Sequence, residues 1–143
     1  MHTKNILLTL CTTVIFGCST SSPNQMNRNW SLYNSSDLLG TKTYIDYSNI
    51  EIKGNLRSFW TLTNFSSPAK NVYNDKKYLS TLSKDTVDCL NKSLAPVSYY
   101  HFTEAFGAGE LIYQQEKDIN QLNFEKGKPK SGLEGTILRI CLS

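Results

Sequence analysis

The sequence predicts an α+β fold, in which a short C-terminal helix packs on an antiparallel β-sheet and is attached to it by a disulfide. Three observations support this fold class. Residues 41–63 alternate between two faces with a period of two, which is typical of half-buried strands. Apolar residues near the C-terminus change to a helical period. Cys89 precedes that segment and Cys141 lies inside it.

The first seventeen residues have the pattern of a secretory leader. Lys4 gives a positive start, residues 6–16 are mostly apolar, and Gly17 is the small residue that a cleavage site needs. The apolar run is shorter than the roughly 20 residues that span a bilayer as a helix. We therefore expect residues 1–17 to be a signal peptide that is removed, and not a transmembrane anchor.

The segment Ile15-Phe16-Gly17-Cys18 resembles the lipobox of bacterial lipoproteins. The resemblance implies that Cys18 receives a diacylglycerol, that cleavage precedes it, and that the new N-terminus is acylated, with palmitate as the typical chain. Several acyl chains, at about 0.8 kcal/mol per buried methylene, would make this anchor permanent. The alternative is a plain secreted protein, although Phe16 is bulky for an ordinary cleavage site. Ser19, where an aspartate would retain a lipoprotein at the inner membrane, favours the outer membrane.

Composition predicts one domain after a short tether. Residues 18–29 are rich in serine, asparagine and proline, so we expect a flexible tether from Cys18 and a domain over residues 30–143. Removing 17 of the 143 residues leaves 126, enough for one core. It also removes Lys4 and lowers the formal net charge from +3 to +2. So mild a positive charge does not predict nucleic-acid binding.

The cysteines predict one structural disulfide. Cys11 leaves with the leader and the lipid occupies Cys18, so Cys89 and Cys141 remain. Two thiols in an exported protein are most simply a disulfide. It would close a loop of about 50 residues and contribute roughly 4 kcal/mol on the chain-entropy model. The alternatives are a metal site or a redox pair, but neither cysteine has a CxxC partner and His101 is the single histidine left after processing.

The remaining elements follow from alternation and turn residues. We expect a hairpin of two strands joined at residues 53–55, then a loop at 66–77, and two short strands that flank a turn at Lys84-Asp85. Further strands are expected at 97–102 and 111–113, with a glycine-rich turn between them and a loop at 125–132.

The predicted helix begins after Ser131. Leu133, Ile137, Ile140 and Cys141 fall on one helical face. Ser131 and Glu134 fit a capping box, in which the serine accepts from the third helical N–H and the glutamate reaches back. Because Gly135 and Thr136 weaken so short a helix, a bond from Cys141 to Cys89 would give it the support that it needs.

No pattern of residues predicts catalysis, a cofactor or a metal site. Gly107 and Gly109 form a lone GxG before a strand, which indicates a tight turn and not a phosphate cradle. His101, between two aromatic residues of a strand, is interpreted as a sheet-surface or interface residue and not as a ligand. Eight tyrosines cannot all point inward, and exposed tyrosines suit a binding face. They are Tyr33, Tyr44, Tyr47, Tyr73, Tyr78, Tyr99, Tyr100 and Tyr113.

Taken in order, these motifs resemble the surface-adhesin protein E family of Gram-negative lipoproteins. The resemblance is carried by Tyr44-Ile45-Asp46, Phe59-Trp60, Asp88-Cys89, the turn at Gly107 and Gly109, and the final Cys141, over roughly residues 30 to 141. It implies an antiparallel sheet of about six strands with the C-terminal helix attached by the disulfide to one face.

The resemblance also implies a function. It implies a non-enzymatic outer-membrane lipoprotein that binds host extracellular-matrix proteins such as vitronectin and laminin, through residues that the sequence does not identify. The alternative is an inward-facing periplasmic lipoprotein that contacts other envelope proteins in an envelope-maintenance role. An exposed sheet edge would also allow a homodimer.

Overall fold

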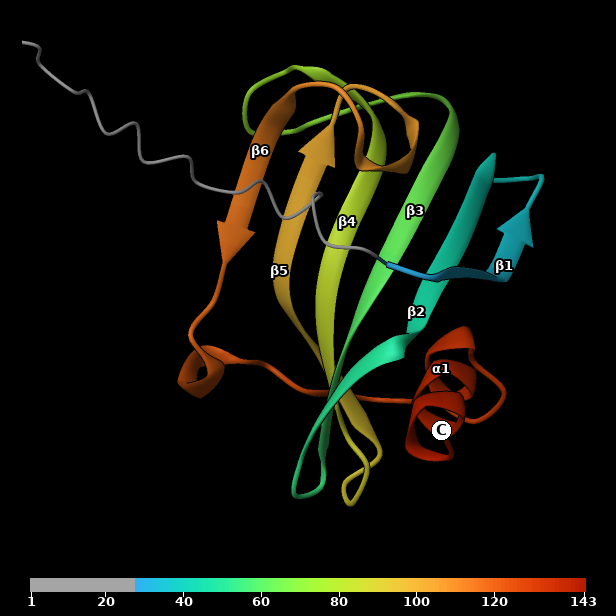
Figure 1. The fold of residues 1–143 in the computed structure, drawn as a ribbon, viewed down its shortest axis with the longest axis vertical. Helices are drawn as coiled ribbons and strands as arrows, with labels where there is room; N and C mark the ends of the chain where they lie inside the picture. Colours follow the sequence, from blue (N-terminus) through green and yellow to red (C-terminus); the bar gives the residue numbers. More distant parts are fainter. Residues whose placement is uncertain (1–27) are drawn as a thin grey trace, which may run out of the picture.

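A computed structural model describes residues 28–143 of this chain. The predicted leader at 1–17, the lipidation site Cys18 and all but the end of the tether at 18–29 therefore lie outside the described residues. The described part is a curled antiparallel sheet with one short α-helix at its C-terminal end (Figure 1). Its elements are β1 (Trp30–Ser36), β2 (Thr41–Lys53), β3 (Leu56–Lys70), β4 (Lys77–Asp88), β5 (Ser93–Phe102), the 3-10 helix η2 (Ala105–Gly107), β6 (Leu111–Glu116), the 3-10 helix η3 (Ile119–Gln121), β7 (Glu125–Lys126) and α1 (Gly132–Cys141).

The sheet is a meander, in which each strand from β1 to β6 pairs with the next one in the chain. The two-residue strand β7 pairs with the start of β5, where β6 no longer reaches. The strands cross Figure 1 in this order, from β6 on the left to β1 on the right. The predicted α+β fold with about six antiparallel strands is thus confirmed.

The β2–β3 hairpin turns where the sequence predicts it. Lys53 pairs with Leu56, so Gly54 and Asn55 form the two-residue loop. Gly54 has a φ of 59°, at the first central position, where type II′ hairpin turns place a glycine.

Both ends of the loop predicted at 66–77 are wrong. The loop is shorter, because β3 continues to Lys70 and β4 begins at Lys77. Pro68, which has no N–H to donate, lies where the pairing with β4 is interrupted between Asn64 and Ala69.

The sequence also gives no sign of β1, which has a bulge between Leu32 and Asn34.

The turn expected at Lys84-Asp85 is also wrong, because β4 runs through it without a break. The irregularity lies on the partner strand instead. Lys84 pairs with Ser98 and Asp85 with Pro96, which leaves Val97 as an extra residue in β5. The bulge in β5 therefore accounts for the irregular pairing, while β4 stays continuous.

The helix and its attachment are confirmed. Cys89, just after β4, is bonded to Cys141 at the end of α1, with a Cα–Cα distance of 5.6 Å. The Ser131 side chain accepts a hydrogen bond from Glu134 N at 3.1 Å, as expected of an N-cap. Glu134 reaches one residue further back than a capping box requires, since its carboxylate accepts from Lys130 N at 2.6 Å.

The sheet has an apolar cluster on each face. Beneath α1, the buried residues Ile45, Phe59 and Val87 pack against Ile137 and Ile140 of the helix. On the opposite face the cluster consists of Trp60, Leu62, Leu82, Tyr100 and Phe102. Side chains alternate along a strand, so Phe59 and Trp60 point to opposite faces and mark the two sides.

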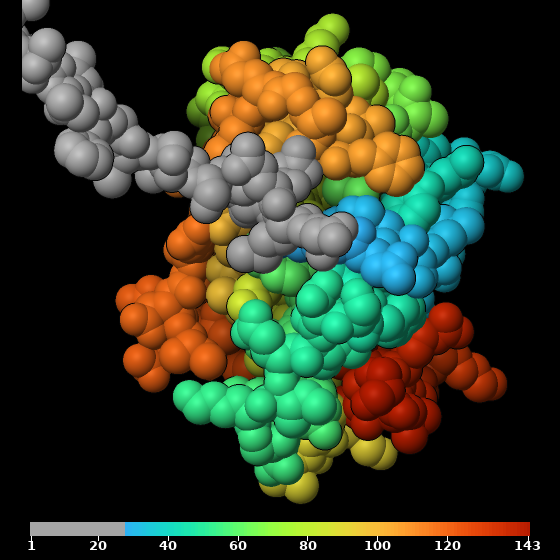
Figure 2. Space-filling model, in the orientation of Figure 1, coloured from blue at the N-terminus to red at the C-terminus, as the bar shows by residue number. Residues whose placement is uncertain are grey.

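The connection between β5 and β6 covers part of the Trp60 face. The buried Ser80 hydroxyl donates to Glu104 O at 2.5 Å and accepts from Gly107 N at 2.9 Å. Asn64 accepts from Phe106 N at 2.8 Å. Figure 2 shows this connection in orange at one end of the molecule and α1 in red toward the other. The predicted glycine-rich turn at 107–109 belongs to this connection.

Candidate functional site

The face that carries α1 is only partly covered by it, and the remainder presents two rows of side chains. Directly paired residues point to the same side, so the register places these side chains together. The first row is Thr43, Thr63, Thr81, His101 and Tyr113, and the second continues from Ile45 through Thr61, Ser83, Tyr99 and Gln115. We call these rows, without the buried Ile45, the open face. All of its residues except Ser83 and Gln115 are half-buried; Ser83 is 6% exposed and Gln115 is exposed.

Hydroxyl groups fix the arrangement of the open face. Thr43 and Thr63 are hydrogen-bonded across β2 and β3 at 3.2 Å. Thr81 of β4 lies 2.9 Å from Nδ1 of His101 on β5. These bonds link neighbouring strands through side chains as well as through the backbone, and such cross-strand pairs stabilise a sheet. The open face is therefore a preorganised surface.

Aromatic rings form a continuous line along one end of this face, which we call the aromatic strip: Phe65, Tyr78, His101, Tyr113 and Tyr73. The ring centroids of Tyr78 and His101 are 4.1 Å apart and stacked, and those of His101 and Tyr113 are 5.2 Å apart and stacked. Tyr73 stacks on Tyr113 at 5.2 Å, and Phe65 meets Tyr78 edge-on at 5.3 Å. These five residues come from the strands β3, β4, β5 and β6 and from the 71–76 loop.

His101 lies in the middle of the strip. Partial burial lowers the pKa of its imidazole, so the ring is neutral at pH 7. It is held by stacking on both sides and by the hydrogen bond with Thr81. The interpretation of His101 as a sheet-surface residue agrees with this placement.

The 71–76 loop holds Tyr73 at the outer end of the strip. The side chain of Asn71, which is 3% exposed, accepts from Tyr73 N at 2.8 Å. Asn74 donates to Ile112 O on β6 at 2.7 Å, and Lys76 forms an ion pair with Glu110 at 3.1 Å. Tyr73 itself is 75% exposed, so one side of its ring is available to a partner. The loop also protects part of the free edge of β6.

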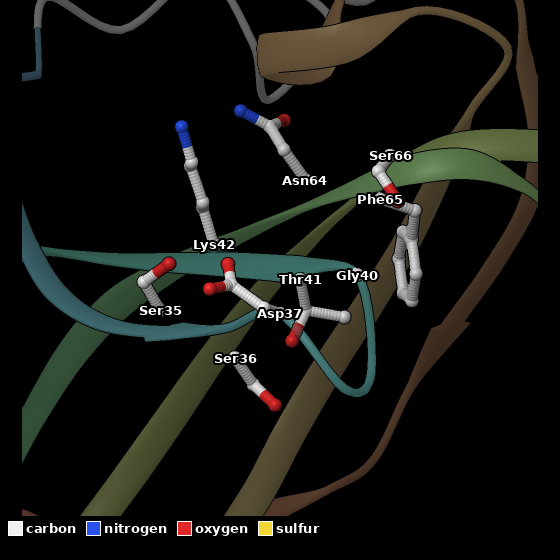
Figure 3. A pocket seen from close by; sticks show the side chains of 9 residues that line it. All are labelled: Ser35, Ser36, Asp37, Gly40, Thr41, Lys42, Asn64, Phe65 and Ser66. Carbon is white, nitrogen blue, oxygen red and sulfur yellow. The ribbon is translucent and has the colours of Figure 1, made fainter.

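A cavity of about 330 Å³ adjoins the other end of the strip (Figure 3). Phe65 belongs to both. The turn between β1 and β2 closes the cavity, and Gly40 in this turn has a φ of 58°. A Cβ on Gly40 would come within 2.3 Å of the Ser66 hydroxyl, so the close approach requires glycine. Its lining is Ser35, Ser36, Asp37, Gly40, Thr41, Lys42, Asn64, Phe65 and Ser66.

Asp85 lies where the open face meets the helix-covered part of the sheet. It pairs with the buried Phe59 and is two residues from the buried Val87. Its carboxylate accepts hydrogen bonds from Ser83 at 3.0 Å and Thr61 at 3.2 Å. Burial raises the pKa of Asp85 to about 6, although these two hydrogen bonds oppose the shift.

The Trp60 face carries a different group of side chains. The Arg28 guanidinium lies 3.9 Å from the ring centroid of Trp60, and Lys84 Nζ lies 5.9 Å from it. Lys84 forms an ion pair with Glu51 at 2.8 Å and lines a second cavity of about 400 Å³ with it. This cationic side chain is thus paired within the domain.

The structure separates the eight tyrosines into two groups. Tyr33, Tyr44, Tyr47 and Tyr100 pack against the two apolar clusters. The other four, Tyr73, Tyr78, Tyr99 and Tyr113, lie on the open face or in the aromatic strip. The expectation that some tyrosines form an exposed surface therefore agrees with the structure.

Sequence reasoning missed Asp85, because Lys84-Asp85 was interpreted as a turn. The signal was present in the alternation of Thr81, Ser83, Asp85 and Val87, which continues the strand pattern through the supposed turn. Among residues 28–143, no group of histidine, cysteine and acidic side chains could hold a metal ion. Nor does any helix in this part of the chain have the length and apolarity needed to cross a bilayer.

A family model described as surface-adhesin protein E matches residues 30–141. The chain belongs to this family. No curated protein sequence matches the chain. Among solved structures, it is similar to protein E from non-typeable Haemophilus influenzae, with a TM-score of 0.54 and 17% identity over 74% of this chain and 71% of that one.

Two further crystal structures of H. influenzae protein E agree with this match. The selenomethionine form matches with a TM-score of 0.53 and 18% identity, over 70% of this chain and 78% of that one. Crystal form II matches with a TM-score of 0.53 and 19% identity, over 70% of this chain and 80% of that one. At these identities the likeness shows that the adhesin E domain has the same fold.

Proposed function

We propose that this chain is a non-enzymatic, lipid-anchored binding module on the outer membrane, which attaches the cell to host extracellular-matrix proteins such as vitronectin or laminin. Membership of the surface-adhesin protein E family supports a binding role. The observation that carries the proposal is the aromatic strip, because it gathers rigid aromatic side chains on an uncovered sheet face. Aromatic residues are enriched among those that dominate protein–protein binding energy.

The anchor in this proposal is Cys18. The lipobox pattern around it would attach the chain to the membrane after residues 1–17 are removed. Twelve residues, 18–29, then span at most roughly 40 Å when fully extended, so the domain over 30–143 would stay near the membrane surface. A homodimer through a free sheet edge is compatible with this arrangement.

The first test is accessibility on whole cells that express the full chain. Antibody labelling of intact cells that added protease removes would support display on the outer surface. Labelling that appears only after the cells are permeabilised would contradict surface display. That result would favour the alternative, an inward-facing periplasmic lipoprotein with an envelope-maintenance or protein-interaction role.

The second test asks whether the aromatic strip binds. Cells carrying Tyr73→Ala or Tyr113→Ala should adhere to vitronectin- or laminin-coated surfaces roughly tenfold less than cells with the unchanged protein, as expected for loss of one aromatic anchor. Phe106→Ala is the matched control, since Phe106 is 52% exposed and contacts Tyr44 on the opposite face. Equal losses in all three variants, or no loss in any, would contradict binding through the strip.

A further inference from the structure

Asp85, which is half-buried, differs in its partners from Asp46. Asp46, which is fully buried, accepts from Ser48 N and Oγ at 3.1 and 2.6 Å and from Asn49 Nδ2 at 2.7 Å. Arg28 lies on the same face and interacts with it electrostatically. Asp85 has two hydroxyl donors, and within residues 28–143 no lysine, arginine or histidine forms an ion pair with it.

The charged groups near Asp85 do not neutralise it. Arg57, on the adjacent strand, directs Nη1 to the carbonyl oxygens of Gly54 and Leu56. Tyr99 lies on the neighbouring strand, where burial raises the pKa of its phenol and the negative charges of Asp85 and Glu125 raise it further. The Arg57 guanidinium is therefore bound to backbone carbonyls and not to the Asp85 carboxylate, and the other charge nearby, Glu125, is negative.

The open face is otherwise free of formal charge at neutral pH. The chain has 15 lysines and arginines and 12 acidic residues, yet the two rows contain only threonine, serine, tyrosine, glutamine and a neutral histidine. Asp85 and Glu125 are ionised groups at the border of this surface, and Asp85 is the one whose carboxylate accepts hydrogen bonds from the open face, at Thr61 and Ser83. A ligand that covers the face would remove more water from that carboxylate.

Burying an ionised carboxylate without a cation is unfavourable, and a partner's cation would remove that penalty. The same carboxylate would repel an acidic segment. Guanidinium is the cation best suited to this position, because it is weakly hydrated, donates two parallel hydrogen bonds to a carboxylate, and stacks on aromatic rings.

We propose that Asp85 receives a basic side chain, preferably an arginine, from the protein that binds the open face, while the aromatic strip packs against neighbouring residues of that partner. This inference rests on the proposed function, since it names the chemistry of the ligand for the same surface. The raised pKa of Asp85 agrees with this proposal, because it means that the folded domain disfavours the ionised carboxylate. A cation from the partner would stabilise that ionised form.

The test uses a heptapeptide with one arginine between two tyrosines, and the same peptide with citrulline, a neutral analogue of nearly the same shape. Binding to the full chain in detergent is measured by calorimetry, and amide shifts in NMR spectra locate the peptide. We expect the arginine peptide to bind roughly tenfold or more tightly than the citrulline peptide, as a charge-assisted pair predicts. The largest shifts should lie at Ser83, Tyr99 and Tyr113.

Asp85→Asn should abolish the preference for arginine over citrulline, because asparagine keeps the size of the side chain and removes its charge. Asp88→Asn is the matched control, since it removes the same charge three residues away at the end of β4, and it should keep the preference. In a His101→Gln background, lowering the pH from 7.5 to 5 should also remove the preference as Asp85 takes up a proton.

Equal binding of both peptides on the open face would overturn the inference and leave the proposed function standing. An arginine preference that persists in Asp85→Asn would overturn it as well, since the cation would then bind elsewhere. Shifts confined to the Trp60 face would overturn it too. The proposed function fails separately, if the Tyr73→Ala and Tyr113→Ala cells adhere as well as unchanged cells.

Discussion

At the scale of single residues, Asp85 makes the free domain sensitive to pH. Its folded-state pKa of about 6 lies above the ordinary value of 3.8, so the native state holds this proton more tightly than the unfolded state does. Stability contributed by this group is present below about pH 4 and is lost as the pH rises toward 6. Above that value the ionised carboxylate lowers the free energy of unfolding by a constant amount.

Asp85→Asn should therefore raise the free energy of unfolding at pH 7.5 by about 1–2 kcal/mol, or the melting temperature by about 5 °C, with little change at pH 4. Urea denaturation at pH 4, 5, 6 and 7.5 measures this. Asp88→Asn should instead lower the free energy of unfolding at pH 7.5, because hydrogen bonds from Asn91 lower the pKa of Asp88 and stabilise its charged form. If Asp85→Asn follows the pH dependence of the unchanged protein, the carboxylate of Asp85 is not destabilised by folding.

At the scale of elements, α1 depends on its attachment. The helix has ten residues and contains Gly132, Gly135 and Thr136, so it would be marginal alone. Ile137 and Ile140 bury its apolar face, and the disulfide fixes its end beside Cys89. Tyr33 of β1 adds a contact from the other side, with its hydroxyl 2.9 Å from Thr136.

Cys141→Ser should lower the melting temperature by about 10 °C or more, since a loop of this length contributes roughly 4 kcal/mol on the chain-entropy model. Differential scanning calorimetry without reductant measures it, and Cys89→Ser should give the same shift. An unchanged melting temperature would mean that α1 docks without the bond. Adding reductant to the unchanged protein should reproduce the effect of the variants.

The elements that the sequence could predict are those with a local cause. Alternation and the glycine at position 54 specify the β2–β3 hairpin, and Ser131 with an apolar face specifies α1. The continuity of β4 has a weaker local signal, the alternation from Thr81 to Val87, which competes with the turn residues Lys84-Asp85. It depends on the extra residue Val97 in β5, and on Asp85 bonding to hydroxyl groups instead of capping a turn.

At the scale of the whole molecule, the proposed lipid anchor depends on one residue, Cys18. Cys18→Ala should move the protein from the membrane fraction to the soluble fraction, because the lipid-bearing thiol is gone and no helix within residues 28–143 could span a bilayer. Fractionation by ultracentrifugation with immunoblotting measures this. Cys11→Ala is the control and should remain with the membrane. A Cys18→Ala protein that still pellets with membranes would contradict the lipobox interpretation.

The binding surface shows the limit of sequence reasoning at this scale. The sequence indicates that some tyrosines must be exposed, but not which ones. The aromatic strip joins residues as far apart as Phe65 and Tyr113, and they meet only because the four strands β3 to β6 pair in one register. That register includes an interruption after Asn64, which coincides with Pro68, and another next to Val97.

The position of Arg28 bears on how a lipid-anchored domain would face. Arg28 begins the described chain and lies against the ring of Trp60, on the side of the sheet opposite to Thr61 and the open face. If Cys18 carries the lipid, the chain from the membrane reaches the domain on its Trp60 side. The opposite side, with Asp85 and the aromatic strip, would then face the medium before any partner arrives.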